Sequence, residues 1–128
     1  MRILLDTHAL LWWLADDQRL GERARSHIAD EANHIVASAA SLWEIAIKQR
    51  LGKIDADIAE IEREIVLQGF TRLGIEADHL LELSTLPDLH RDPFDRMLVA
   101  QARAEDVPLM TADGQIAGYS VDRIAADR

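Results

Sequence analysis

Five carboxylates occupy positions where either chemistry or local structure would use them. In "DPFDRMLVAQA", Asp92 and Asp95 stand three residues apart and are followed by small and apolar residues. Asp6 interrupts an apolar start, Glu44 stands inside "LWEIAI", and Asp113 belongs to "TADGQ". Carboxylates that converge in a water-poor cleft repel one another unless cations join them. Whether these acids form a site therefore depends on the elements that position them.

Three of the acids have an adequate structural explanation at a turn or helix start. Asp6 follows an apolar run and suits the N-cap of a helix. Asp92 precedes Pro93, a favoured first helical residue, so Asp92 is the natural cap of the helix that follows. Asp113 stands before Gly114, and Asp-Gly is a common turn pair. For these three acids, local structure and chemistry stay open as alternatives.

The other two acids fit their surroundings less well. Glu44 follows Ser41 by three residues, the spacing of a capping box, yet a solvated Glu is unusual among such apolar neighbours. Asp95 falls at the third helical position, where a carboxylate suits the helix dipole. It also shares a helical stripe with three apolar residues, Leu98, Val99 and Ala102. Both acids therefore lie close to a buried face.

Short apolar runs alternate with helical patterns along the chain. We expect strands at 2–5, 34–38, 70–75 and 108–112, and a short fifth strand near 119–121. We expect helices at 7–16, 20–31, 42–53, 56–69, 76–86 and 93–106. Short strands without polar alternation are typical of a parallel sheet covered on both faces. The sequence predicts an α/β fold, a three-layer α/β/α sandwich with a short parallel sheet, in one domain over residues 1–128.

This fold would gather four of the acids at one edge of the sheet. Asp6 and Asp113 follow strands, and ligands of such sheets bind beyond the carboxyl ends of the strands. Connecting helices run antiparallel to the strands, so the helix starts that carry Glu44 and Asp95 lie at the same edge. An oxygen-rich cluster suits Mg²⁺ or Mn²⁺ and a phosphate-containing substrate. Zinc is not indicated, because cysteine is absent and the histidines show no H-x-x-x-H pair.

The bulk composition limits the classes of protein that remain. The chain has 128 residues, of which 48% are hydrophobic, enough for one compact core. Its net charge of −9 opposes general nucleic-acid binding, although a local basic patch is still allowed. The absence of cysteine excludes disulfides and fits a reducing cytoplasm. We expect neither a signal peptide nor a membrane span, and thus a cytoplasmic protein.

Four segments resemble the PIN-domain ribonucleases, and within them the VapC-type toxins of bacterial toxin–antitoxin pairs. They are "LLDTHALLWWL", "SAASLWEIAIKQRLGK", "RDPFDRMLVAQA" and "LMTADGQI", in the family's order and spanning residues 3–116. Each motif alone is weak, but four in order are specific. The resemblance implies that the catalytic, metal-binding acids are Asp6, Glu44, Asp95 and Asp113. It also implies hydroxyl groups near the metal from Thr111 and, more weakly, Thr7.

The resemblance carries a functional expectation. It implies a Mg²⁺- or Mn²⁺-dependent endoribonuclease that leaves a 5′-phosphate and a 3′-hydroxyl, forms a homodimer, and is neutralised by a cognate antitoxin. One alternative is a catalytically silent PIN-like module that only binds a partner. A second alternative, a phosphoacceptor receiver domain, needs an Asp after the third strand and a Lys after the last. The third strand runs into "LGIEAD" and no Lys follows Lys53, which argues against a receiver domain.

Several further residues have both a structural and a functional interpretation. Lys48 stands four residues after Glu44 and suits a helix ion pair. Arg91 and Arg96 flank Asp95 and suit either phosphate binding or plain surface charge. Core or interface packing is favoured over RNA stacking for the tryptophans, Trp12, Trp13 and Trp43. His8 is expected to be packed or exposed, and one stripe is expected in the core, Ile58, Ile61 and Ile65.

Overall fold

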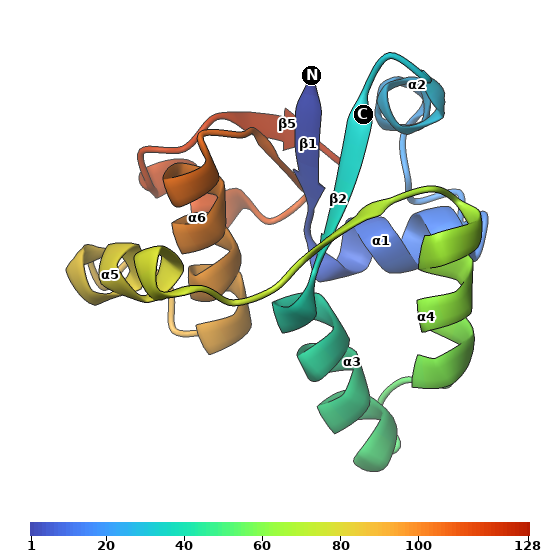
Figure 1. The fold of residues 1–128 in the computed structure, drawn as a ribbon, viewed down its shortest axis with the longest axis horizontal. Coiled ribbons are helices and arrows are strands. Elements are labelled where there is room, and N and C mark those ends of the chain that lie inside the picture. Colours follow the sequence, from blue (N-terminus) through green and yellow to red (C-terminus); the bar gives the residue numbers. More distant parts are fainter.

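The computed structural model describes residues 1–128 and shows a five-stranded parallel sheet between two layers of helices (Figure 1). The strands are β1 (Arg2–Leu5), β2 (His34–Ser38), β3 (Thr71–Leu73), β4 (Leu109–Thr111) and β5 (Arg123–Ala125). The helices are α1 (Thr7–Leu14), α2 (Glu22–Ala29), α3 (Ala39–Arg50), α4 (Ile58–Leu67), α5 (Ala77–Thr85) and α6 (Pro93–Glu105). A short 3₁₀ helix, η1 (Gly114–Gly118), follows β4. The predicted α/β/α sandwich is confirmed.

The strand order, β3-β2-β1-β4-β5, places β1 at the centre of the sheet. The chain fills one side with β2 and β3 and then crosses to the other side for β4 and β5. Leu5 at the end of β1 pairs with Ala37 of β2 and with Met110 of β4. The carboxyl ends of these three strands are therefore level. The strand order reverses between β1 and β4, the place where open parallel sheets bind ligands.

Two separate apolar cores cover the two faces of the sheet. Alternate side chains of β1 point to opposite faces, so Ile3 and Leu5 belong to one core and Leu4 to the other. The first core includes α1, α2 and α4, and it buries Ile61 and Ile65 as predicted. The second core is formed mainly by α6, with η1 and the chain after it. In Figure 1, α5 and α6 lie on one side of β1 and β2, with α1, α2 and α4 on the other.

The fifth strand is the element whose predicted position is wrong. It lies at Arg123–Ala125, where it pairs with β4, and not near 119–121. The apolar residues of "YSV" serve core packing and not strand pairing. Tyr119 is buried against the second core at the end of η1, and its hydroxyl accepts a hydrogen bond from the His90 N–H at 2.9 Å. Residues 119–122 carry the chain from η1 back to the sheet, where β5 pairs with β4.

Helix α3 begins three residues earlier than predicted, which removes the capping explanation of Glu44. Ser38 is the N-cap, and its hydroxyl accepts a hydrogen bond from the Ala40 N–H at 3.0 Å. Ser41 is buried inside the helix, so the predicted Ser41–Glu44 capping box does not form. The other predicted helices and strands differ from the structure by a few residues at their ends. None of the helices combines the length and apolar character needed to cross a membrane.

Candidate metal centre

Asp6 is positioned by the junction of β1 and α1. It is the N-cap of α1, where its carboxylate accepts a 2.7 Å hydrogen bond from the Ala9 N–H. Its side chain is almost completely buried. Burial raises the pKa of Asp6, and hydrogen bonds from Thr111 and the Ala9 N–H offset only part of that rise. The capping interpretation is therefore correct but incomplete, because a cap does not require a buried charge.

Glu44 is held in the interior by partners from two helices. It is 2% exposed, and one carboxylate oxygen accepts a 2.6 Å hydrogen bond from the Thr7 hydroxyl. The other oxygen pairs with the Lys48 ammonium group at 2.6 Å, the predicted helix ion pair. This pair raises the pKa of Lys48. Thr7 and Lys48 together fix the orientation of a carboxylate that faces the sheet edge.

Asp95 lies in the first turn of α6, whose start is fixed by Asp92. One oxygen of Asp92 accepts hydrogen bonds from the Phe94 N–H at 2.9 Å and the Asp95 N–H at 3.0 Å, as predicted for the cap. Burial, followed by repulsion from Asp92 and Glu44, raises the pKa of Asp95 to about 7. The electrostatic influence of the neighbouring His90 lowers this pKa, and the charge of Asp6 adds to the repulsion. The fold thus places Asp95 where burial and neighbouring negative charges disfavour its ionised form.

Asp113 lies between the end of β4 and the start of η1, and it borders the site on that side. One of its oxygens accepts a 2.9 Å hydrogen bond from the Gln115 N–H at the start of η1. Its other oxygen lies 2.8 Å from Nε2 of His90. Burial alone would raise the pKa of Asp113, but these two hydrogen bonds, the electrostatic influence of His90 and a hydrogen bond with Asp95 together outweigh it and lower the pKa. Thr111 supports the loop by accepting the Asp113 N–H at 3.0 Å.

The acids are therefore brought to one edge of the sheet, though at different distances from one another. His90, Asp95 and Asp113 offer ligand atoms that all lie within 4.8 Å of one another. Asp6 and Glu44 stand outside this close set, and both raise the pKa of Asp95 through their negative charge. Each of the four predicted acids thus acts directly on another member of the group. The structure groups Asp95 and Asp113 with His90, and it places Asp6 and Glu44 close enough for their charges to affect the pKa of Asp95.

His90 is the residue that sequence reasoning missed. Its Nε2 lies 2.8 Å from Asp113 and 3.1 Å from Asp95. No local pattern marks it, because Asp113 is 23 residues away and the contact depends on the crossover of the fold. The available signal was weak: a His two residues before a helix cap, in the same segment as a candidate acid.

Other predicted residues divide between structural and exposed roles. Arg96 is structural, because its guanidinium donates to the Pro87 carbonyl at 2.9 Å and to the Tyr119 hydroxyl at 3.2 Å. Arg91 and His8 are exposed. Trp12 and Trp13 pack against the first core, as predicted. Trp43 lies outside the core, because it is 57% exposed and meets the Phe94 ring edge-on at a centroid distance of 5.0 Å, so of the two predicted alternatives interface packing stays a prediction.

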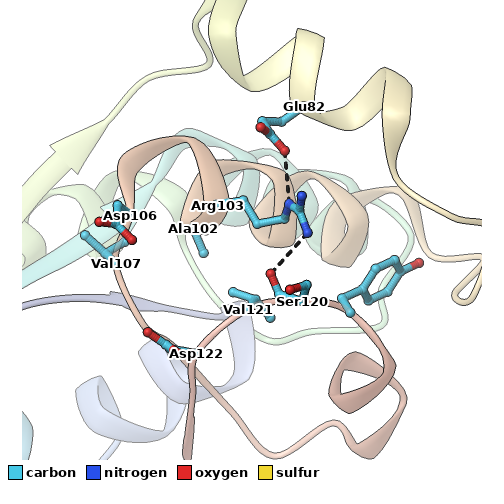
Figure 2. Close-up of a pocket in the computed structure, with 9 residues that line it drawn as sticks. Glu82, Ala102, Arg103, Asp106, Val107, Ser120, Val121 and Asp122 are labelled. Atoms are coloured by element: carbon cyan, nitrogen blue, oxygen red, sulfur yellow. Dashed lines mark hydrogen bonds and ion pairs between the residues drawn. The ribbon is translucent and has the colours of Figure 1, made fainter.

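A shallow pocket elsewhere in the molecule is a weaker candidate. It measures about 480 Å³ and lies between α5, the second half of α6 and the chain after η1 (Figure 2). Arg103 crosses it, donating to Glu82 at 3.0 Å and to the Ser120 carbonyl at 3.1 Å. Arg103, the only cationic side chain in its lining, is thus already hydrogen-bonded to the protein. None of the four acids lines this pocket. The sheet edge remains the better site.

The donor set at the sheet edge fits a hard divalent cation. Buried carboxylates whose pKa values are raised, as for Asp6 and Asp95, are held close together against their mutual repulsion. A divalent cation would remove that repulsion, and Mg²⁺ and Mn²⁺ accept ligand sets rich in carboxylate oxygens. Zn²⁺ sites in proteins are built mainly from thiolate and imidazole.

The fold and this edge together define a class of protein. Residues 3–121 match the family model of the PIN domain. Because the match covers nearly the whole chain, the protein belongs to the PIN domain family. In sequence it is similar to Ribonuclease VapC22 of Mycobacterium tuberculosis (strain ATCC 25618 / H37Rv), with 29% identity over 119 residues that cover 91% of each protein.

Solved structures share the fold at low sequence identity. VapBC2 from Rickettsia felis, bound to a DNA fragment from its promoter, has a chain with a TM-score of 0.71 and 15% identity, covering 97% of this chain and 98% of that one. A toxin–antitoxin complex from Klebsiella pneumoniae has a chain with a TM-score of 0.61 and 20% identity, covering 97% of both chains. At these identities the likeness confirms the fold.

Proposed function

We propose that this PIN domain, residues 1–128, is a metal-dependent endoribonuclease of the toxin class, which hydrolyses phosphodiester bonds in RNA. The observation that carries the proposal is the buried carboxylate group at the sheet edge, where the pKa of Asp95 is raised to about 7 by burial and neighbouring charges. The similarity to a protein named a ribonuclease supports RNA as the substrate.

In this proposal Asp6, Glu44, Asp95 and Asp113 hold Mg²⁺ or Mn²⁺. The bound ion would supply the positive charge that activates water and stabilises the leaving oxygen of the phosphodiester. Thr7 orients Glu44 through their 2.6 Å hydrogen bond, and Thr111 orients Asp6 and the Asp113 loop. Lys48 offsets the negative charge of Glu44, and in this proposal it also binds a phosphate of the substrate.

Nuclease activity with structured and single-stranded RNA, in Mg²⁺ or Mn²⁺ and in EDTA, tests this function. We expect cleavage only with metal, and a loss of about a hundredfold or more in Asp6→Asn, because a ligand and its charge are removed. Asp127→Asn is the matched control, since Asp127 is exposed near the end of the chain. Cleavage that survives both EDTA and Asp6→Asn would contradict the metal mechanism.

The proposal includes a protein partner, a cognate antitoxin, and a homodimer within the complex. A structural neighbour is itself a toxin–antitoxin complex, which supports an antitoxin. A groove of about 710 Å³ beside α1 and α4 offers a place for one, with an apolar floor that includes Leu11, Trp12 and Ile61. Exposed apolar side chains on α3 and at its C-cap, Trp43, Ile47 and Leu51, support contact with a second copy of the chain.

A catalytically silent PIN-like binding module is the alternative. It predicts substitutions or gaps among the site acids, whereas all four are present and three of them lie at neighbouring strand ends or helix starts around β1. The nuclease assay above separates the two functions, because a silent module would cleave no RNA in either metal.

A further inference from the structure

His90 lies between the carboxylates of Asp95 and Asp113, and its Nε2 is close to both. Its Nε2 is 2.8 Å from Oδ2 of Asp113 and 3.1 Å from Oδ2 of Asp95. Two-metal sites use a position of this kind, in which a second ion about 4 Å from the first shares a carboxylate with it. The ring is 12% exposed, so the imidazole is mostly enclosed by the site.

The other ring nitrogen determines what Nε2 can do. Nδ1 of His90 lies 3.1 Å from the backbone N–H of Asp92. A backbone N–H can only donate, so Nδ1 must accept, and the hydrogen of the neutral ring is on Nε2. The two carboxylates therefore face an N–H group and not a lone pair. The His90 N–H donates its own hydrogen bond to the Tyr119 hydroxyl at 2.9 Å, which ties the backbone of this residue to η1 as well.

The same contact argues against His90 as a metal ligand. Coordination through Nε2 needs a lone pair there, which would move the hydrogen to Nδ1. Nδ1–H would then face the Asp92 N–H, two donors without an acceptor between them. Asp92 is also the cap of α6, so a shift of its backbone would disturb the helix start that carries Asp95.

We propose that His90 is a positioning residue that fills the second cation position with its Nε2–H group and restricts the site to one divalent ion, shared by Asp6, Glu44 and Asp95. The inference rests on the proposed metal-dependent function and specifies its metal content. The inference therefore takes Asp113 out of the ligand set proposed above: Asp113 acts on the site through His90, whose Nε2 lies 2.8 Å from its Oδ2, and through its negative charge near the ion. Lys48 serves Glu44 in a similar way, as a cation supplied by the chain itself.

The number of bound ions tests the inference without reference to activity. Metal-free full-length protein is titrated with Mn²⁺, and free and bound ions are counted by electron paramagnetic resonance. We expect the wild type to saturate at about one Mn²⁺ per chain with an uncoupled spectrum. His90→Ala is expected to bind about two, with spin coupling between ions about 4 Å apart. Saturation of the wild type with two coupled ions would overturn the inference.

Two variants and one isotope label complete the experiment. His90→Gln keeps an N–H near the position of Nε2 and is expected to stay at about one Mn²⁺, while His34→Ala, an exposed histidine at the start of β2, behaves as the wild type. Wild-type protein with ¹⁵N-histidine should show no nitrogen coupling to bound Mn²⁺. Nitrogen coupling, or a single ion in folded His90→Ala, would overturn the inference.

The outcomes for this inference and for the proposed function are distinct. If the wild type binds one ion and His90→Ala binds two, but RNA is not cleaved, the inference stands and the function fails. If RNA is cleaved with metal but the wild type binds two coupled ions, the function stands and the inference fails. The wild-type measurements need no variant, so a misfolded His90→Ala protein would not prevent a decision.

Discussion

Asp95 is the carboxyl group whose ionisation the fold opposes most clearly. Burial and the charges of Asp92 and Glu44 raise its pKa from 3.8 to about 7. Between these two values the folded protein keeps a proton that the unfolded chain has released. Raising the pH through this window therefore lowers the free energy of unfolding of the metal-free protein, and the loss is complete above the folded-state pKa.

Asp95→Asn should remove this penalty and flatten the pH dependence. In EDTA at pH 8, where Asp95 is ionised, we expect the variant to melt higher than the wild type by on the order of a few degrees. The difference should shrink toward pH 5, where the wild type is protonated. Thermal unfolding at both pH values measures it, with the fully exposed Asp88→Asn as control. A lower melting temperature at pH 8 would mean that the helix dipole dominates at this position.

The Thr7 hydroxyl makes a second prediction at the level of one residue. It is buried and donates to Glu44 at 2.6 Å, and the Ser41 hydroxyl oxygen lies 3.1 Å away. Thr7→Val keeps the shape but leaves a buried carboxylate oxygen without its donor, so the free energy of unfolding should fall by about 1–3 kcal/mol. Urea denaturation measures the fall, and Thr7→Ser should restore most of it. An unchanged Thr7→Val protein would show that water replaces the hydroxyl.

The residues of the site were predictable where a motif or a cap marked them. Asp6, Asp92 and Asp113 combine a local role with a place at a strand end or helix start, and local roles are visible in the sequence. His90 was not predictable, because its contacts with Asp113 and Tyr119 link segments 23 and 29 residues apart. The choice between core and interface packing for Trp43 was not predictable, since an apolar run does not reveal which face of α3 is turned away from the core.

At the scale of elements, the start of α6 decides where Asp95 points. Asp92→Ala removes the acceptor for two backbone N–H groups, and such losses cost about 0.5–2 kcal/mol. We expect a lower melting temperature and reduced nuclease activity, because the first turn carries the acid. Asp92→Ser retains a cap and should recover the stability. Full activity in Asp92→Ala would show that the turn is held by its tertiary contacts.

Element boundaries were predictable to the extent that local signals set them. The strands at 2–5 and 34–38 were placed correctly, since each is a short apolar run ended by a polar cap, Asp6 or Ser38. The start of α3 was misplaced because two serines, Ser38 and Ser41, compete for the cap and only tertiary packing selects between them. β5 was misplaced because its pairing with β4 is long-range and its own sequence is short and polar at one end.

At the scale of the whole molecule, the net charge affects the binding of RNA and the binding of a protein partner. A net charge of −9 repels RNA, so the proposed RNA binding would depend on local cations and on the proposed metal. The same charge favours a basic protein partner. The groove beside α1 and α4 combines apolar lining residues with an excess of acidic over basic side chains: Asp17, Asp55, Asp57, Glu60 and Glu64 against Arg19 and Lys53, of which Arg19 pairs with Asp17. This combination suits an amphipathic segment with basic residues.

Charge reversal in that groove should weaken antitoxin binding and leave RNA cleavage intact. In a variant that combines Glu60→Lys with Glu64→Lys, we expect at least about a tenfold rise in Kd, because complementary charge is replaced by repulsion. Titration calorimetry with the cognate antitoxin measures it. Asp127→Lys changes the net charge away from the groove and should have little effect. Equal weakening by Asp127→Lys would show a general charge effect, and unchanged binding in the groove variant would place the antitoxin on another surface.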